Sequence, residues 1–276
     1  MQIVSHSFYG RKPIQIMPLF DIHLGAEACD EDKLRESIAR VANTSRMYVI
    51  GGGDYAEYIA KSDKRFDVRS LASWMIDKDA LADPALAQTD RIVSYLRPVA
   101  HKSLGMISGN HEASMSKYYE RDILGEICRG IGRRDLMMGY EGWIILNFWA
   151  NKSEAPPDHT IRIRVHHGYG GGRSEGAPMN AMQMMMLTHE ADLVLMGHIH
   201  KRGVANPVMV EYIENGVPKY RIRKGMYCGT YLRTRIVGPS TYAAVAGYNV
   251  TLAVGSPILT VNPWVPDLDQ RIVVSA

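Results

Sequence analysis

The amino-acid sequence predicts a mixed α/β fold, and three observations favour this class. Short apolar runs typical of buried strands alternate with amphipathic segments whose apolar residues recur at helical spacing. Several apolar runs end beside glycine in an aspartate, asparagine or histidine, as expected where the strands of an α/β sheet end at a ligand site. Residues 204–276 are rich in strand-like runs, so we expect a mainly β part after the alternating elements.

A β-α-β unit is predicted near the N-terminus. The apolar stretch at residues 14–21 (IQIMPLFD) predicts the first strand, and residues 46–54 (RMYVIGGGD) predict the second. Between them, residues 30–42 carry apolar side chains at helical spacing with acidic residues in the first turn, which predicts a helix. A helix that connects two neighbouring strands favours a parallel pair.

The rest of the chain continues the alternation, and residues 55–103 are mostly helical in pattern. The same patterns predict a strand and a turn at 104–112, strands at 138–150, 160–168 and 191–197, and helices at 114–131 and 177–191. Residues 208–224 predict a β-hairpin, because two strand-like runs flank the favourable turn sequence ENG. Since no repeat or linker interrupts the chain, we expect residues 1–276 to form one domain.

Composition and charge are typical of a folded protein with a sizeable core. The chain has 276 residues, 46% of them hydrophobic and 22% charged, and its net charge of +3 is too small by itself to indicate nucleic-acid binding. The three cysteines form no CxxC pair, as in a reduced chain without disulfides. The first residues lack a signal-peptide pattern, and no apolar run reaches the ~18–20 residues that span a bilayer. We therefore expect a cytoplasmic protein without membrane contact.

Polar residues follow five of the predicted strands. In chain order they are Asp21-Ile22-His23, Gly53-Asp54, Gly109-Asn110-His111-Glu112, His166-His167-Gly168 and Gly197-His198-Ile199-His200. Imidazole and carboxylate ligands suit divalent Mn, Fe and Zn, and no thiolate lies among them. In an extended backbone alternate residues face the same way, so Asp21 and His23 can reach one centre. The strand ends therefore predict a site for a pair of metal ions.

These five blocks resemble the pattern of the calcineurin-like metallophosphoesterase superfamily. The family pattern reads D-x-H, G-D, G-N-H-[DE], H-G and G-H-x-H, and this chain has DIH, GD, GNHE, HHG and GHIH in the same order. The resemblance covers about residues 14–235, the motif core. It implies a metallophosphoesterase-type β-sandwich of two mixed sheets flanked by α-helices, which is a four-layer α/β/β/α arrangement.

The resemblance also implies the ligands of two divalent ions, with Mn²⁺ as the first expectation and Fe or Zn as alternatives. One ion would be bound by Asp21, His23 and His200, the other by Asn110, His167 and His198, and both by Asp54 as a bridge. The family ligand in the HHG block is normally the histidine before glycine, which is His167. In an extended strand, however, His167 would lie on the same face as the apolar residues of 160–165, and His166 on the face with the arginines. His166 therefore stays an alternative ligand.

Two further residues receive catalytic roles from the resemblance. His111 matches a family histidine that acts on the substrate and does not bind metal. Glu57, in GDYAE, occupies the position at which the phosphatase branch has an acid that hydrogen-bonds this histidine, although glutamate is one methylene longer. Arg173, in the glycine-rich segment 168–178, is a candidate substrate-binding residue for a phosphate group, and a plain surface loop is the alternative.

The implied activity is that of a metal-dependent phosphoester hydrolase that acts through a metal-bridging hydroxide. A phosphodiesterase or nuclease is the first interpretation, with DNA or another nucleic acid as the expected class of substrate. The GDYAE block suggests a phosphomonoesterase, acting on phosphoprotein or nucleotide, as an alternative. A non-catalytic scaffold with the same fold is a second alternative, which the intact ligand set argues against.

Basic residues gather in several stretches that the motifs do not use. They are Arg129, Arg133 and Arg134; Arg162 and Arg164; Lys219 to Lys224; and Arg233 and Arg235. A nucleic-acid backbone is one ligand that such stretches can bind. Solvated strand faces are the simpler interpretation, and we favour it.

Overall fold

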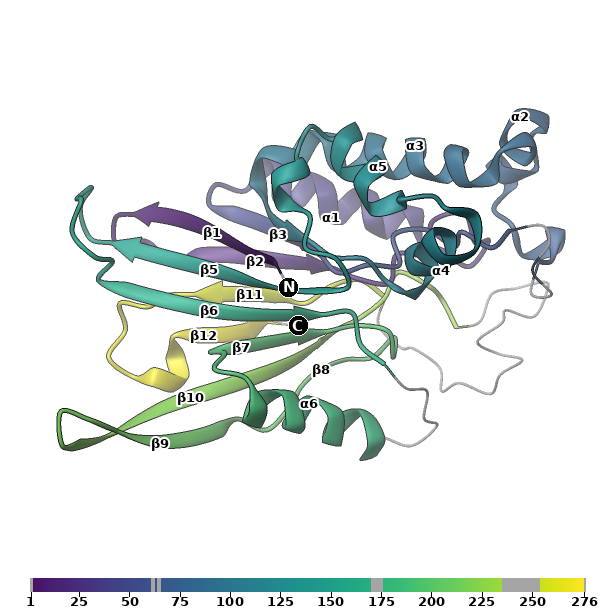
Figure 1. The fold of residues 1–276 in the computed structure, drawn as a ribbon. Coiled ribbons are helices and arrows are strands. Elements are labelled where there is room, and N and C mark those ends of the chain that lie inside the picture. The colour runs from purple at the N-terminus through teal and green to yellow at the C-terminus, as the bar shows by residue number, and fades with distance from the viewer. Residues whose placement is uncertain (1, 61–62, 64–65, 170–175, 235–253, 276) are drawn as a thin grey trace.

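Two β-sheets form the centre of the structure, and helices lie on their outer faces (Figure 1). The computed structural model describes residues 2–60, 63, 66–169, 176–234 and 254–275. Within these ranges, no helix is both long and apolar enough to cross a membrane. The mixed α/β class predicted from the sequence is confirmed.

The five-stranded sheet has the strand order β12-β11-β2-β3-β4. Its strands are β2 (Ile14–Leu19), β3 (Met47–Gly51), β4 (Ser103–Met106), β11 (Ile258–Val261) and β12 (Ile272–Ser275). Strands β2, β3 and β4 run parallel to one another. Helix α1 (Glu31–Asn43) connects β2 to β3, so the predicted β-α-β unit and its parallel pair are confirmed.

The second sheet has the order β1-β5-β6-β7-β10-β8, and β9 pairs with β10. Its strands are β1 (Gln2–Tyr9), β5 (Glu141–Trp149), β6 (His159–His166), β7 (Leu193–Met196), β8 (Arg202–Val204), β9 (Val208–Glu214) and β10 (Val217–Cys228). Strand β7 runs parallel to both β6 and β10. Strands β9 and β10 form the predicted hairpin, and Asn215 and Gly216 take left-handed φ angles of 52° and 75° in its turn.

Strand β1 precedes the strand that the sequence places first, so that expectation is wrong. β1 pairs in parallel with β5, from Gln2 opposite Gly142 onwards. Most of its side chains are exposed or half-buried, with only Phe8 fully inside, so it lacks the apolar run of a central strand. His6 on β1 donates a hydrogen bond from Nε2 to the carbonyl of Leu104 over 2.7 Å and has a structural role.

Apolar side chains from both sheets pack against each other in the space between them. Ile16 of β2 and Leu146 of β5 are fully buried there, as are Ile163 of β6 and Leu195 of β7. The two sheets therefore bury their inner faces against each other, and this layer is a continuous core.

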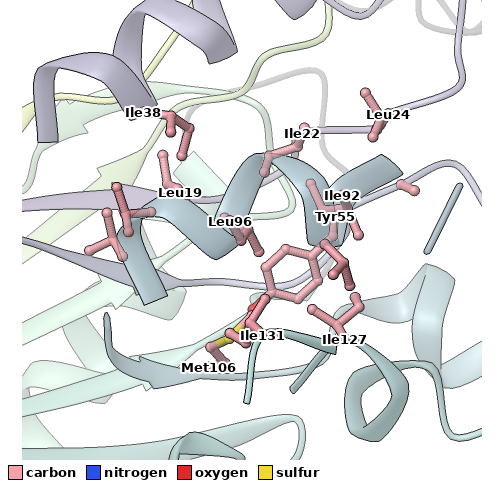
Figure 2. Packing of buried hydrophobic residues seen from close by; sticks show 14 of the residues in the cluster. Leu19, Ile22, Leu24, Ile38, Tyr55, Ile92, Leu96, Met106, Ile127 and Ile131 are labelled. Carbon is pink, nitrogen blue, oxygen red and sulfur yellow. The ribbon is translucent and has the colours of Figure 1, made fainter. Parts of the chain in front are cut away.

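Helices cover the outer face of each sheet. On the five-stranded sheet, α1, α3 (Pro84–Leu96) and α5 (Ile123–Gly130) bury a large cluster that Figure 2 shows from close by. On the other sheet, α6 (Gly176–Thr188) packs Met182 and Met186 onto the strands. Met182, Met185 and Met186 are thus core residues, whereas Met184 of the same helix is exposed.

The segment 114–131 contains two helices where the sequence predicts one. Helix α4 (Asn110–Tyr119) ends at Glu120, whose φ of 56° is left-handed and stops the helical hydrogen bonding. The side chain of Asp122 then accepts a hydrogen bond from the N–H of Gly125 and begins α5. The amphipathic pattern continues across this break, but the Asp122 cap starts a separate helix.

Residues 55–103 are helical only in part, contrary to the mostly helical pattern. The described helices of this segment are α2 (Lys78–Ala82), α3 and the 3-10 helices η1 (Val68–Ser70), η2 (Ser73–Ile76) and η3 (Arg97–Lys102). Elsewhere in the described chain lie the 3-10 helices η4 (Arg134–Leu136) and η5 (Leu268–Gln270). Asp77 and Asp83 each cap a new helix with the side chain. The helical periodicity is therefore divided among short helices, and residues 55–60, directly after Asp54, form no helix.

Candidate metal centre

Five strand ends meet at one edge of the two sheets, because β2, β3 and β4 run parallel in one sheet and β6 and β7 run parallel in the other. Direct hydrogen bonds join the loops that follow them. The N–H of Asp21 donates to the carbonyl of Gly53 over 3.2 Å, and that of Gly197 to the carbonyl of His167 over 3.0 Å. The N–H of His198 donates to Oδ2 of Asp21 over 2.8 Å, which ties one sheet to the other.

The predicted ligand residues lie together at this edge. Their ligand atoms form three groups within 4.8 Å: Asp21 with His23 and His200, Asp54 with His167 and His198, and His23 with Asp54 and His111. Asn110 joins the second group, since its Oδ1 lies 3.1 Å from Nε2 of His167 and 2.8 Å from Nδ1 of His198. Two of the groups therefore coincide with the two ligand sets that the sequence motifs imply, and Asp54 lies between them.

Five of these residues have a left-handed backbone. The φ angles are 49° at Asp21, 52° at His23, 51° at Asp54, 68° at His198 and 54° at His200. This conformation costs residues other than glycine about 1–2 kcal/mol each, so it persists only where the surrounding structure enforces it. Such strain concentrates at functional sites, and here it falls on the cluster of potential ligands.

Apolar neighbours anchor the strained loops. Ile22 and Leu24 alternate with the polar residues of the first loop, and both are fully buried. Tyr55 directly follows Asp54 and is fully buried as well. Figure 2 shows the three side chains among the members of one buried cluster, which also contains Ile92 and Leu96 of α3. Burial of these side chains therefore fixes the backbone from which the polar side chains extend.

Glu112 holds two of the loops together, a role that the sequence reasoning missed. Its buried carboxylate accepts hydrogen bonds from the N–H groups of Asp54 (2.9 Å), Tyr55 (2.8 Å) and Gly109 (2.7 Å). The signal was present, because a glutamate at the third position of a helix is typical of a capping box. Gly109 is required here, since a Cβ atom would lie 2.1 Å from Oδ1 of Asp54.

Glu57 contacts both His23 and His111, but not as the family pattern implies. Its carboxylate accepts a hydrogen bond from Nδ1 of His23 over 3.0 Å. His111 instead donates from Nδ1 to the backbone carbonyl of Glu57. The expected side-chain contact between Glu57 and His111 is therefore replaced by a backbone contact. In both histidines the bonded Nδ1 leaves Nε2 directed to the centre with a free lone pair in the neutral ring.

His167, and not His166, belongs to the cluster. His167 is fully buried, donates from Nδ1 to the carbonyl of Gly52 over 2.8 Å, and has its Nε2 3.2 Å from Oδ2 of Asp54. His166 is the last residue of β6, and its Nδ1 accepts the N–H of Gly168 over 2.8 Å. His167 comes after the end of β6, where side chains no longer alternate between the two faces of the sheet. Its position in the alternating pattern therefore does not exclude it from the cluster.

The residues present fit a pair of divalent cations. Oδ1 of Asp21 is buried and has no hydrogen-bond partner in the described part of the chain, an arrangement that is costly unless a cation faces it. The Nε2 atoms of His23 and His200 face each other at 3.0 Å. Two nitrogens that bind one metal at ~2.1 Å and at right angles would be about 3.0 Å apart. Oxygen and imidazole ligands without thiolate are the set that Mn, Fe and Zn accept.

Charges inside the cluster shift the pKa values of its members in opposite directions. Burial lowers the pKa of His23, but the Glu57 carboxylate outweighs it and raises the value to about 9. Burial likewise lowers the pKa of His167, while Asp54 raises it to about 10. Burial and the neighbouring His23 hold the pKa of His200 well below its usual value. In the absence of metal, two protonated imidazoles therefore balance the buried carboxylates.

The two aspartates differ although both are buried. Burial raises the pKa of Asp21 to about 7, against the opposing charge of His167. Burial would also raise the pKa of Asp54, but His167 and His111 outweigh it and hold the pKa well below its usual range. Asp54 is thus ionised across the physiological range, which is the form that can bind a metal ion.

Arg173 lies outside the described residues, as does most of the glycine-rich segment around it. Ile199 packs against the cluster under α6, so it points away from its two histidine neighbours.

No protein-family model matches this chain, and a search of curated proteins found no match either.

Proposed function

We propose that this protein is a phosphoester hydrolase that depends on two divalent metal ions. One observation carries the proposal: seven ligand-type side chains from five strand ends lie together, and one of them, Asp21, has a buried carboxylate oxygen without a hydrogen-bond partner among the described residues. The ordered motifs, which resemble those of the calcineurin-like metallophosphoesterases, support the same proposal. On this proposal the two packed sheets and their outer helices correspond to the four-layer arrangement of that superfamily.

The residues would divide the work of the reaction. Asp21, His23 and His200 would hold one ion, Asn110, His167 and His198 the other, and Asp54 both. Two ions bound there would act as Lewis acids on the phosphoryl oxygens and lower the pKa of a bound water toward neutrality. His111 is only 11% exposed, and its Nε2 is directed to the centre because Nδ1 donates to a backbone carbonyl. From there it would hydrogen-bond the phosphoryl group or protonate the leaving oxygen.

A phosphodiesterase or nuclease is the reading that we favour over a phosphomonoesterase. The sequence feature that suggests the monoesterase is the GDYAE block, in which an acid would orient the histidine that acts on the substrate. In this chain the Glu57 carboxylate instead contacts His23, one of the proposed metal ligands. The monoesterase interpretation therefore lacks the contact on which it depends.

The test compares substrates and metals on the purified protein. We expect Mn²⁺ to support hydrolysis of bis-p-nitrophenyl phosphate, and labelled single- or double-stranded DNA to be cleaved, at a higher rate than p-nitrophenyl phosphate. Asp21→Asn removes one charge from the centre and should abolish both metal binding and turnover. Asp32→Asn, in the exposed first turn of α1, is the matched control and should leave both unchanged.

The outcomes separate the candidate functions. Preference for the monoester would favour the phosphatase, and activity that survives Asp21→Asn would show that another site does the chemistry. Metal binding without hydrolysis of any substrate, with Mn, Fe or Zn, would instead favour the non-catalytic scaffold.

A further inference from the structure

A second polar cavity lies away from the candidate metal centre, and it uses two of the basic stretches that the motifs leave unexplained. Its volume is about 170 Å³, room for several waters at ~30 Å³ each. Residues from β6, β9, β10, η5 and β12 line it, so it is formed by segments far apart in the chain. Four of the lining residues are cationic: Arg162, Arg221, Lys224 and Arg271.

The cavity lies at the opposite end of the strands from the metal centre. Arg162 is near the start of β6, whereas His167 follows its last residue. Five residues of strand span about 16 Å. Lys224 similarly pairs with Leu193 at the start of β7, whereas His198 follows the end of that strand. A ligand in this cavity would therefore bind separately from a substrate at the metal centre.

Two of the four cations are already neutralised. The ammonium group of Lys224 contacts Oδ1 of Asp269 at 2.9 Å and the carbonyl of Ile272 at 2.8 Å. The guanidinium of Arg221 bonds Glu190 at 2.5 Å and lies over the ring of Tyr212, 5.4 Å from its centroid. These groups build the walls of the cavity and have little bonding capacity left.

The other two cations keep their capacity to bind a ligand. The Arg162 guanidinium lies 3.9 Å from the carboxylate of Asp192, too far for a hydrogen bond. Arg271 donates from Nε to the carbonyl of Val265 over 3.1 Å, and its two terminal nitrogens have no hydrogen-bond partner among the described residues. Asp192 is the one acid in the lining, and backbone contacts with Arg162 hold it in place.

We propose that this cavity is a second binding site for a phosphate group, with Arg162 and Arg271 as its ligands. Guanidinium forks match the oxygens of phosphate in charge and geometry. Tyr212 and Tyr220 also line the cavity, and their hydroxyls are the type of group that can donate further hydrogen bonds to the same oxygens. Inorganic phosphate and the phosphate of a mononucleotide share this chemistry. The site is independent of the proposed hydrolase activity.

The experiment measures binding of inorganic phosphate and, separately, of a nucleoside monophosphate by titration calorimetry. Arg162→Gln combined with Arg271→Gln should weaken the binding at least about tenfold, because both variants remove a charged donor to the phosphate oxygens. Arg40→Gln, an exposed arginine on α1, is the control and should bind as the natural protein does. Tighter binding of the mononucleotide would identify a nucleotide as the ligand, and equal binding would identify phosphate alone.

Phosphate can also bind at the metal centre, so the same titrations are made on Asp21→Asn. Binding at the second site should survive that variant and be lost in the double arginine variant. The heat-unfolding transition of each variant reports whether it is folded. Binding that Asp21→Asn abolishes, or that the double arginine variant retains at full strength, would overturn the proposal, as would no binding at millimolar phosphate.

Discussion

Nδ1 of His23 donates a hydrogen bond to the carboxylate of Glu57 over 3.0 Å, and this contact determines which ring nitrogen of His23 faces the cluster. Because Nδ1 is turned to Glu57, Nε2 is the nitrogen that faces the cluster, 3.0 Å from Nε2 of His200. Carboxylates that hydrogen-bond a metal-binding histidine fix its tautomer and increase its basicity. Glu57 therefore serves the candidate metal centre through His23.

Replacing Glu57 should weaken metal binding more than it changes the fold. Glu57→Gln keeps an acceptor for His23 but loses the charge, and Glu57→Ala loses both. Loss of such a partner lowers metal affinity about 10- to 100-fold, so we expect glutamine near the lower figure and alanine near the higher. Mn²⁺ titration by calorimetry measures this. Glu36→Gln, at a glutamate with 68% of its side chain exposed, should have no effect. Equal affinities in all variants would show that the contact with His23 is not functional.

Substitution of His111 and of Asp54 should separate turnover from metal binding. His111→Ala should retain metal and lose turnover by about 10²–10⁴-fold, the usual contribution of a general acid. Asp54→Ala should lose metal as well, because the Asp54 carboxylate belongs to two of the three groups of potential ligands. Metal content by mass spectrometry and turnover of the diester distinguish the two effects, with His101→Ala, an exposed histidine, as the control. If His111→Ala lost metal, His111 would be a ligand.

Local sequence signals predicted the strands that carry the site, because each is a strand-like run followed by an aspartate, asparagine or histidine, in four of the five blocks beside glycine. The seven potential ligands were found in this way, and the structure brings them together. Strand β1 escaped prediction, because an edge strand with mostly exposed side chains has no apolar run. The division between α4 and α5 escaped for a different reason, since it depends on the left-handed backbone at Glu120.

Contacts between segments distant in sequence were beyond the reach of pattern reasoning. The side-chain partner of Glu57 is one example, because nothing local to residues 53–57 indicates that its carboxylate points to His23. The choice between His166 and His167 is another, since it depends on where the strand alternation stops. The left-handed backbone at Asp21 and His23 likewise follows from how the loops meet, and neither residue type requires it.

Removal of the Glu112 carboxylate should destabilise the protein strongly. Glu112→Ala leaves three backbone N–H groups without their acceptor, and each unsatisfied buried donor costs about 1–3 kcal/mol. We therefore expect the free energy of unfolding in urea to fall by about 3 kcal/mol or more, and less for Glu112→Gln, which keeps one acceptor oxygen. Glu36→Ala is the exposed control. A loss below about 1 kcal/mol in Glu112→Ala would contradict the assigned role.

The histidines of the cluster make the stability of the metal-free protein depend on pH. In the folded state the pKa of His23 is raised to about 9 and that of His167 to about 10, from an ordinary value of 6.5. The folded state therefore binds these two protons more tightly than the unfolded state does. Their stabilising contribution is complete below pH 6.5 and is lost as the pH rises through about 9 to 10. Asp21, with a pKa of about 7, titrates mainly below this window.

We accordingly expect the melting temperature of the chelator-treated protein to fall between pH 7 and pH 9. Added metal should reduce the fall, because it replaces the two protons and binds more tightly as they leave. Burial also raises the pKa values of Cys128 and Cys228, so these thiols likewise lower the stability of the folded state as the pH rises to near 9. Variants are therefore needed to separate the contribution of the histidines from that of the cysteines. The double variant His23→Gln, His167→Gln should have a flatter pH profile than the natural protein, whereas His101→Gln should reproduce the natural profile. A metal-free melting temperature that is constant or rises from pH 7 to pH 9 would contradict the assigned protonation of His23 and His167.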